Sequence, residues 1–479
     1  MAAVFLGPTK SSADPWAAPG DVALRHDISV LADRGILRGP ITSWPLSWPD
    51  IARDVLGRQL DASTDRATRA ALIRVQRAAR RMTRIGEVEW HARSAVAEEP
   101  TPLRTFADEP REEGELGLGA SWTGERFGVR LQALGVVDPD DDREIRLDGS
   151  YAGVNIGNFM VSAGAMERWW GPGWEGSLIL SNSARPIPSI TVERNYSDAF
   201  DVPVLRWFGP WRASIVLGQL EGSRADFPDA RFLGMRVSFK PLQQLEIGLS
   251  RTAQWCGEGR PCNFRTFGDL LTGRDNDQAL GEQPGNQLAG YDARWAFKSI
   301  PVAAYGQLIG EDEAGGLPSK FLGLAGMEVW GSSPLGEWRL HAEYADTSCS
   351  FSHAEPEFNC AYESSIYTQG YRYRGRSIGH AMDGDGRMYS AGAVLITDLD
   401  DEWHVLARRV ELNRDSMTPD SRHTLAPVAA EVTNIELSHT RSVPVGRLRV
   451  GVGYDDYKAR LDGGDDSTLR GFVQLMRPF

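Results

Sequence analysis

Apolar residues recur with a helical period from Asp21 to about Gly86, which is the pattern of helices that bury one face. Ser47, with Pro49 close behind it, is typical of a helix start, and Gly35 and Gly86 are typical of helix ends. We therefore predict a small bundle of three amphipathic helices. Their apolar positions are Leu24, Ile28 and Leu31, then Ile51 and Val55, then Leu72, Val75, Ala79 and Met82.

From about Glu115 to the end the period changes to two, as in strands with one apolar face. Alternation alone also fits a soluble β-sandwich. However, about eighteen such segments follow one another between Gly, Asp and Pro turns, each near the length that a tilted membrane-spanning strand needs. No helical pattern interrupts them after about residue 100, and a closed barrel needs no covering helices. The clearest runs are Leu116–Trp122, Met235–Phe239, Trp338–Tyr344 and Leu448–Tyr454.

We therefore predict a mainly β protein, a transmembrane antiparallel β-barrel of about 18 strands with a small N-terminal helical bundle. Its last segment ends on Phe479, as the terminal strands of bacterial outer-membrane barrels commonly do. We expect this segment to pair with the first strand, at an edge where Arg477 and Pro478 are tolerable. Its apolar row consists of Leu469, Gly471, Val473 and Leu475.

These patterns divide the chain into an N-terminal segment (1–20), a helical bundle (21–100) and a barrel (101–479). Met1–Leu6 is apolar but short and carries no positive charge, whereas Ser11-Ser12-Ala13 resembles the end of a signal-peptide cleavage site. We predict that the first segment is the remnant of an export signal.

The net charge of -13 argues against a nucleic-acid partner, because phosphate binding requires a basic surface. The chain has 51 Gly, 15 Trp and 12 Tyr, but it has no run near the ~18 apolar residues of a membrane helix, so any crossing must use strands. Acidic residues cluster at 138–142, 398–402 and 462–466. Solvated hairpin tips account for these clusters. A cation that bridges them to a lipid or polysaccharide phosphate is the alternative.

The third predicted helix carries a row of arginines, whose usual explanation is a solvated face. Contact with anionic phospholipid head groups or with an acidic barrel rim is the alternative. The row consists of Arg74, Arg77, Arg80, Arg81 and Arg84.

The four cysteines form two close pairs, Cys256 with Cys262 and Cys349 with Cys360, each within a loop-like stretch. This spacing favours two local disulfides in an oxidising compartment over zinc ligation. Loops closed in this way lose less entropy on binding, so they are candidate contact sites. Loop stability alone is an equally good explanation.

The stretch Met166–Pro188 places three tryptophans around a Gly171-Pro172-Gly173 turn and is predicted to be a β-corner, with Leu178–Leu180 as a strand. Indoles beside polar groups could stack on and hydrogen-bond to a sugar. The other interpretation is a packed turn at a membrane boundary or inside a barrel lumen. The candidate polysaccharide-binding residues are Glu167, Arg168, Trp169, Trp170, Trp174, Asn182 and Arg185.

With these motifs the chain resembles the capsule assembly protein Wzi family of outer-membrane proteins nearly end to end, and the tryptophan-rich corner is the most specific match. The resemblance implies an 18-stranded barrel with a periplasmic helical bundle, which attaches capsular or extracellular polysaccharide to the bacterial surface as a lectin-like factor. It implies contact with outer-membrane lipids, including lipopolysaccharide, and with the barrel assembly machinery during insertion. It supplies no catalytic residues. The matching motifs are Leu24–Asp27, Trp44–Leu46, Arg168–Trp174, Leu180–Pro186 and Ser250–Gly257.

Two other functions fit the same pattern. A porin for sugars or small anions would line its pore with inward charges, although these could also pair and close the lumen. A barrel enzyme acting on polysaccharide or lipid could use Glu167 and Glu175 as acid and base. However, the eight histidines form no His-Glu-x-x-His motif and no nucleophile elbow is present, so we predict no enzyme, cofactor or metal. The candidate pore residues are Arg236, Lys240, Arg339, Glu343, Arg447 and Arg449.

Overall fold

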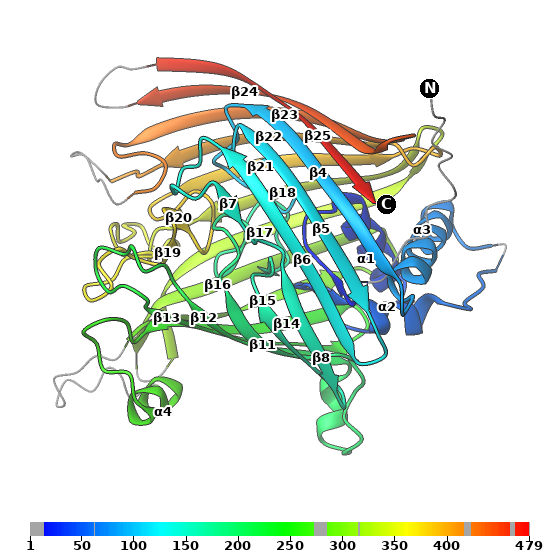
Figure 1. The fold of residues 1–479 in the computed structure, drawn as a ribbon, viewed down its shortest axis with the longest axis horizontal. Helices are drawn as coiled ribbons and strands as arrows, with labels where there is room; N and C mark the ends of the chain where they lie inside the picture. The colour runs from blue at the N-terminus through cyan, green and yellow to red at the C-terminus, as the bar shows by residue number, and fades with distance from the viewer. Residues whose placement is uncertain are drawn as a thin grey trace.

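The computed structural model describes residues 14–61, 63–272, 285–314, 317–415, 423–459 and 465–478. Its dominant feature is a closed antiparallel barrel (Figure 1). The barrel strands are β4 (Val88–Glu98), β5 (Gly114–Thr123), β6 (Phe127–Val137), β7 (Ile145–Arg146), β8 (Tyr151–Ile156), β9 (Phe159–Gly164), β11 (Ser189–Arg194), β12 (Trp211–Gln219), β13 (Arg231–Leu242), β14 (Leu245–Trp255), β15 (Gly285–Ala296), β16 (Val302–Ala314), β17 (Leu317–Ser333), β18 (Gly336–Asp346), β21 (Arg387–Ile396), β22 (Glu402–Leu412), β23 (Ala430–Val443), β24 (Gly446–Ala459) and β25 (Asp465–Pro478).

The ring closes where the last strand meets the first, as predicted. β25 pairs with β4 in antiparallel register from Gly471 opposite Glu98 to Pro478 opposite His91. β7 and β8 both pair with β6, one after the other along its length, so the barrel has 18 strands. Phe479, the predicted end signal, lies outside the described residues.

The predicted alternation is confirmed in the walls of the barrel. On β24, Val450, Val452 and Tyr454 are exposed on the outer face, while Gly451 and Gly453 between them are buried. An apolar exterior over a barrel without free edges is the arrangement that a bilayer requires. Among the described residues, the helices are all too short or too polar to cross a membrane.

The three predicted helices are present at one end of the barrel, where tight turns join the strands (Figure 1). They are α1 (Val22–Asp33), α2 (Trp48–Val55) and α3 (Arg66–Met82). The side chain of Ser47 accepts a hydrogen bond from Asp50 N and caps α2, as expected, and Asp21 and Asp65 cap the other two helices.

Two expectations from the sequence are wrong, namely the start of the barrel and the absence of helices after about residue 100. The barrel begins at Val88 rather than at residue 101, because Val88–Glu98 alternates between exposed residues such as Trp90 and Val96 and inward residues such as Arg93. A short helix, α4 (Phe264–Thr272), also occurs after residue 100, and its Leu270 packs on Leu233 and Ala253 of the outer wall. The alternation in Val88–Glu98 and the helical pattern in α4 were both too short to stand out from the surrounding sequence.

The remaining short elements belong to the connections. Residues 14–20 pack beside the bundle, where the Tyr151 hydroxyl donates to Asp14 at 2.5 Å, and residues 1–13 lie outside the described part. These elements are β1 (Trp16–Ala17), β2 (Ser43–Trp44), β3 (Leu46–Ser47), β10 (Trp169–Trp170), β19 (Arg372–Tyr373), β20 (Arg376–Ser377) and a 3-10 turn, η1 (Leu205–Phe208).

Candidate functional site

The tryptophan-rich corner lies inside the barrel. Between β9 and β11 the chain turns inward, and its β10 pairs with β2 of the N-terminal region, Trp169 opposite Trp44. Trp169, Trp170 and Trp174 are 0%, 1% and 3% exposed, so in this conformation none of them offers a ring face to a sugar. In this structure the corner is therefore a packed turn inside the barrel lumen, which was the alternative to a sugar-binding corner.

The predicted strand at Leu178–Leu180 is wrong. This segment is irregular and buried, and it joins the largest apolar cluster of the barrel interior. Its backbone groups are satisfied by single contacts instead of by a sheet: Leu178 N donates to the side chain of Gln307 at 2.7 Å, and Leu180 O accepts from the backbone N of Trp170 at 2.9 Å. An apolar run inside a filled lumen has the same composition as a buried strand.

Arg25 of α1 fastens the corner to the helical bundle. Its guanidinium donates to Pro172 O at 2.7 Å and to Gly173 O at 2.8 Å. It also lies over the rings of Phe106 and Trp174, at 4.3 Å and 4.2 Å from their centroids. Burial lowers the pKa of Arg25 to about 10, so the side chain keeps its charge at neutral pH.

On its other side, the corner contacts the long connection between β18 and β21, residues 347–386. The hydroxyl of Tyr362 donates to Leu178 O at 2.7 Å, and the hydroxyl of Tyr371 donates to Ile179 O at 2.8 Å. Burial raises the pKa of both phenols, so they remain protonated donors. Bundle, corner and connection are thus stacked through the lumen in direct contact.

Carboxylates of the barrel wall bind the polar edge of the corner. The indole N–H of Trp174 donates to Glu328 at 2.8 Å, and Glu328 is also paired with Arg339 at 2.6 Å. Glu175, the carboxylate proposed for acid–base chemistry, is buried and contacts His341 Nε2 at 2.6 Å. Trp174 stacks on the ring of that histidine. These contacts place Glu175 in a packed network, away from any open surface.

The other predicted sugar ligands are also engaged within the protein. Arg168 is buried and donates to Thr191 Oγ1 at 2.6 Å, and the buried Asn182 donates to Phe106 O at 3.5 Å. Arg185 is paired with Asp148 at 2.8 Å and with Asp141. Glu167 lies 3.8 Å from Arg111 and lines a cavity of about 190 Å³. The structure thus assembles these residues as a structural unit.

The inward charges proposed for a pore pair with residues of nearby wall strands or of segments inside the barrel, and Lys240 is buried among them. Arg236 is 2.6 Å from Asp292, Arg449 is 2.9 Å from Glu109 of the β4–β5 connection, and Glu343 accepts from Tyr305 at 2.7 Å. Arg447 is 2.9 Å from Asp21 at the start of α1 and also pairs with Glu402. The wall is thus tied to the N-terminal region and to the β4–β5 connection inside the barrel.

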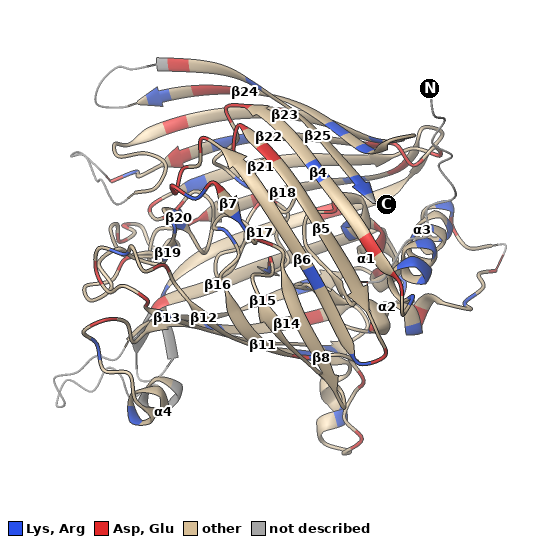
Figure 2. Ribbon diagram, viewed as in Figure 1, with Lys and Arg blue, Asp and Glu red and all other residues tan. Residues whose placement is uncertain are grey.

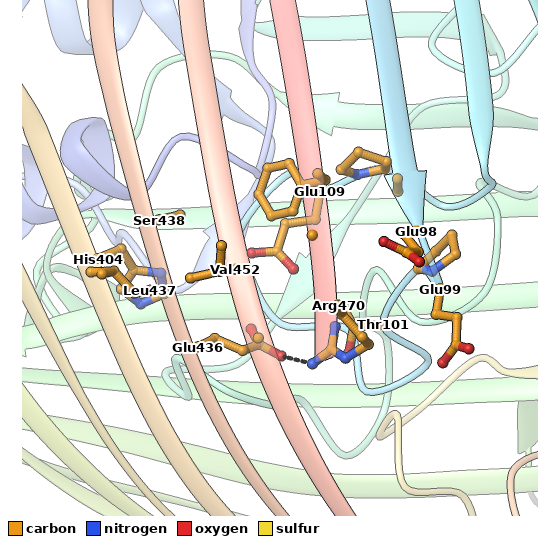
Figure 3. A pocket seen from close by; sticks show the side chains of 16 residues that line it. Glu98, Glu99, Thr101, Glu109, His404, Glu436, Leu437, Ser438, Val452 and Arg470 are labelled. Atoms are coloured by element: carbon orange, nitrogen blue, oxygen red, sulfur yellow. Dashed lines mark hydrogen bonds and ion pairs between the residues drawn. The ribbon is translucent and has the colours of Figure 1, made fainter. Parts of the chain in front are cut away.

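Cavities remain between the barrel wall and the segments inside it. One of about 320 Å³ lies near the helical end, between the N-terminal segment and strands β22 to β25. A smaller one, of about 20 Å³, lies where β23, β24, β25 and β4 meet (Figure 3). There Glu436 and Arg470 form an ion pair of 2.7 Å, with Glu98, Glu99 and Glu109 nearby.

Residues of the acidic clusters and of the arginine row form ion pairs within the protein. Asp141 is buried against Arg146, and Asp398 and Asp400 meet α3 through Arg66 and Arg77 at 2.5 Å and 2.7 Å. Figure 2 shows basic residues along α3 beside the barrel edge. The acidic-rim alternative is therefore correct for this helix. Asp398 and Asp400 also lie at an exposed turn between β21 and β22, as expected for a solvated hairpin tip. Residues 462–464 of the third cluster lie outside the described residues.

Both predicted disulfides are formed, at the barrel end away from the helices. Their loops share a cap that we define as residues 220–230, 256–263 and 347–386. Within it, Tyr367 donates to Cys256 O at 2.9 Å and Arg224 donates to Arg372 O at 2.7 Å. The sequence had no signal for this cap, because its tyrosines and arginines are spread over irregular connections.

A family model for the capsule assembly protein Wzi matches residues 90–468. The chain belongs to the Wzi family. It is 28% identical to the solved structure of Wzi from Escherichia coli, an outer-membrane protein involved in group 1 capsule assembly and described as a carbohydrate-binding β-barrel, with a TM-score of 0.85. That match covers 97% of this chain and 100% of the other.

A Klebsiella pneumoniae protein, named as an uncharacterised 55.8 kDa protein in the cps region, is a further relative of this Wzi-family chain. The two are 33% identical over 423 residues, which cover 86% of this chain and 81% of the relative. The predicted family and the predicted outer-membrane β-barrel are both confirmed.

Proposed function

We propose that this protein attaches capsular or extracellular polysaccharide to the surface of the bacterial outer membrane as a lectin-like factor. The observation that carries the proposal is the match to the carbohydrate-binding Wzi barrel over 97% of the chain. The filled lumen agrees with this role, because a protein that only holds a polymer at the surface needs no passage through its wall.

The cap is the part of the molecule we assign to the polymer. It lies at the end opposite the helices, and Glu258, His353, Glu355 and Asn359 are exposed on it. Each sugar contact with such polar groups would be weak, but a polymer repeats its unit many times. Repeated contacts then retain the chain without a high affinity at any one site.

The orientation of the barrel follows from the same assignment. With the cap outside, the helical bundle lies in the periplasm, and the apolar wall contacts outer-membrane lipids, including lipopolysaccharide. Because the barrel closes only when β25 reaches β4, we assign its insertion to the barrel assembly machinery.

Genetic replacement in the native host tests the role. In a strain that lacks the gene, polysaccharide should be released into the medium, and a plasmid copy should return it to the cells. A cap variant with the exposed Glu355 and His353 changed to Ala should retain less polymer while keeping the heat-modifiable mobility of a folded barrel. Unchanged retention in the deletion strain would contradict the proposal.

A further inference from the structure

The connection between β11 and β12 carries an exposed apolar tip. All residues from 201 to 208 are exposed, and Trp207 reaches 83%. Asp201 and Arg206 are the charged members of this stretch, so its charges cancel. We define the tip by its large apolar side chains, which are Val202, Val204, Leu205, Trp207 and Phe208.

The base of this connection is held firmly. Ser197 Oγ donates to Asp50 of α2 at 2.7 Å, Asp198 pairs with Arg53 at 2.7 Å, and Asn158 of the β8–β9 turn donates to Tyr196 O at 3.0 Å. The tip therefore projects from a fixed platform at the helical end of the barrel. In Figure 1 the green loop below β8 extends downward, away from the barrel interior.

The tip rejoins the barrel on its lipid-facing side. The ring of Phe208 meets Phe239 of β13 edge-on at 5.2 Å, and Phe200 stacks on Trp211 of β12 at 4.6 Å. Trp211 and Phe239 are register partners on the outer face, in line with the exposed Ile215 and Val237. The tip is thus continuous with the wall that contacts lipid, at the level where barrels carry aromatic girdles.

The tip begins where the neighbouring strands end. β8, β9 and β11 have six residues each, and at the helical side they stop at the β8–β9 turn and at Arg194, next to the base of the tip. The tip therefore carries apolar surface beyond the ends of these strands, in continuation of the lipid-facing wall.

We propose that residues 201–208 insert into the membrane interface on the helical side of the barrel, where they bind phospholipid and extend the apolar belt of the outer wall. Tryptophan is suited to this level, since its ring is apolar and its N–H reaches water. The partner is therefore the leaflet next to the bundle, and the proposal does not depend on polysaccharide binding.

Spin labels on the full-length protein in liposomes of bacterial phospholipids test this directly. The four natural cysteines are paired, so Val204→Cys and Trp207→Cys each add a single free thiol. Leu131→Cys, on the outer face of β6, provides the lipid reference, and the exposed Ser63→Cys before α3 provides the water reference. Heat-modifiable mobility on a gel identifies folded variants.

Labels at 204 and 207 should collide with oxygen and be shielded from a water-soluble nickel chelate, as at Leu131→Cys. Chelate access equal to that at Ser63→Cys would overturn the proposal, because the tip would then lie in water. Shielding from both reagents would also overturn it. In that case dipolar broadening between labels would identify a second copy of this chain as the cover, and its absence a different protein.

Discussion

At the scale of single residues, the three tryptophans of the corner act through burial. Their rings lie among the bundle, the wall and the cap, and the indole N–H groups of Trp169 and Trp174 donate to Gly173 O and Glu328. These contacts explain why an indole is required at these positions. The same residues could not also present a face to a sugar unless the lumen opened.

Replacing Trp170 measures this role. Trp170→Ala should lower the free energy of unfolding by about 4 kcal/mol, because it removes a large ring from a close-packed interior. Trp170→Phe should cost clearly less, since it keeps most of the apolar volume. Urea unfolding in detergent, followed by heat-modifiable mobility, provides the measurement. Equal effects of the two variants would contradict a packing role.

Asp385 of the cap gives stability a dependence on pH. Burial, with the nearby carboxylates of Asp415 and Glu363, raises the pKa of Asp385 to about 7. An ordinary aspartate has a pKa of about 4, so the folded protein holds the proton more tightly. The stability that this proton contributes is present at low pH and is lost as the pH rises from about 4 to about 7.

Asp385→Asn should remove this dependence, and the amide still provides an acceptor for the Asn359 N–H, which lies 2.7 Å from the carboxylate. Unfolding temperatures of variant and wild type, measured between pH 4 and pH 8, should differ increasingly in favour of the variant as the pH rises. A difference that stays constant across this range would show that Asp385 is not the titrating group.

At the scale of elements, α3 is attached to the rim by ion pairs of unequal burial. Arg74 is largely buried and pairs with Asp27 at 2.7 Å and Glu337 at 2.9 Å, whereas Arg77 and its partner Asp400 are exposed. If Arg74 is removed, water does not readily reach the buried carboxylates that it pairs with. The exposed pair is screened by solvent and salt.

Arg74→Ala should therefore destabilise the protein by about 3 kcal/mol, because the buried Asp27 loses its partner and the buried Glu337 is left with its contact to Arg66 at 3.3 Å. Arg77→Ala, one turn further along the same helix, should cost about 0.5 kcal/mol at most. Parallel urea titrations of the two variants compare these effects. If both cost the same, the helix is held by its apolar face alone.

The disulfide from Cys349 to Cys360 stabilises the cap without contributing to the wall. A closed loop of this size stabilises the folded state by about 3 kcal/mol in the chain-entropy model. Changing both cysteines to Ser should leave the barrel heat-modifiable but should increase cleavage of residues 347–386 by added protease. The matched control is the Cys256 and Cys262 pair, which closes a shorter loop. If the variant resists protease as well as the wild type does, the tyrosine contacts of the cap, and not the disulfide, hold residues 347–386 in place.

The sequence predicted the elements that repeat a simple period. The helix stripe at Leu72, Val75 and Ala79, and alternation such as Leu448–Tyr454, follow directly from burial on one face. The corner could not be placed in the same way, because Leu178–Leu180 has the composition of a strand wherever it is buried. The partners of Arg25, Arg185 and Glu175 depend on contacts between distant segments, which no local pattern specifies.

At the scale of the whole molecule, the barrel holds a stack of bundle, corner and cap. The corner is hydrogen-bonded to Arg25 on the side of the bundle and to Tyr362 and Tyr371 on the side of the cap. A barrel filled in this way is a rigid support for its outer loops. In the proposed orientation it holds the cap above the membrane, and this geometry suits the retention of a long polymer better than its passage.

Equilibrium binding of the purified, folded protein to capsular polysaccharide from its own host tests the account most directly. We predict saturable binding that the same polymer competes away, that unrelated neutral glycans leave unchanged, and that falls when protease removes the cap. The contradicting result is a folded protein that does not bind the polymer but carries sustained ionic currents across a planar bilayer, because it would then be an open pore rather than a tether.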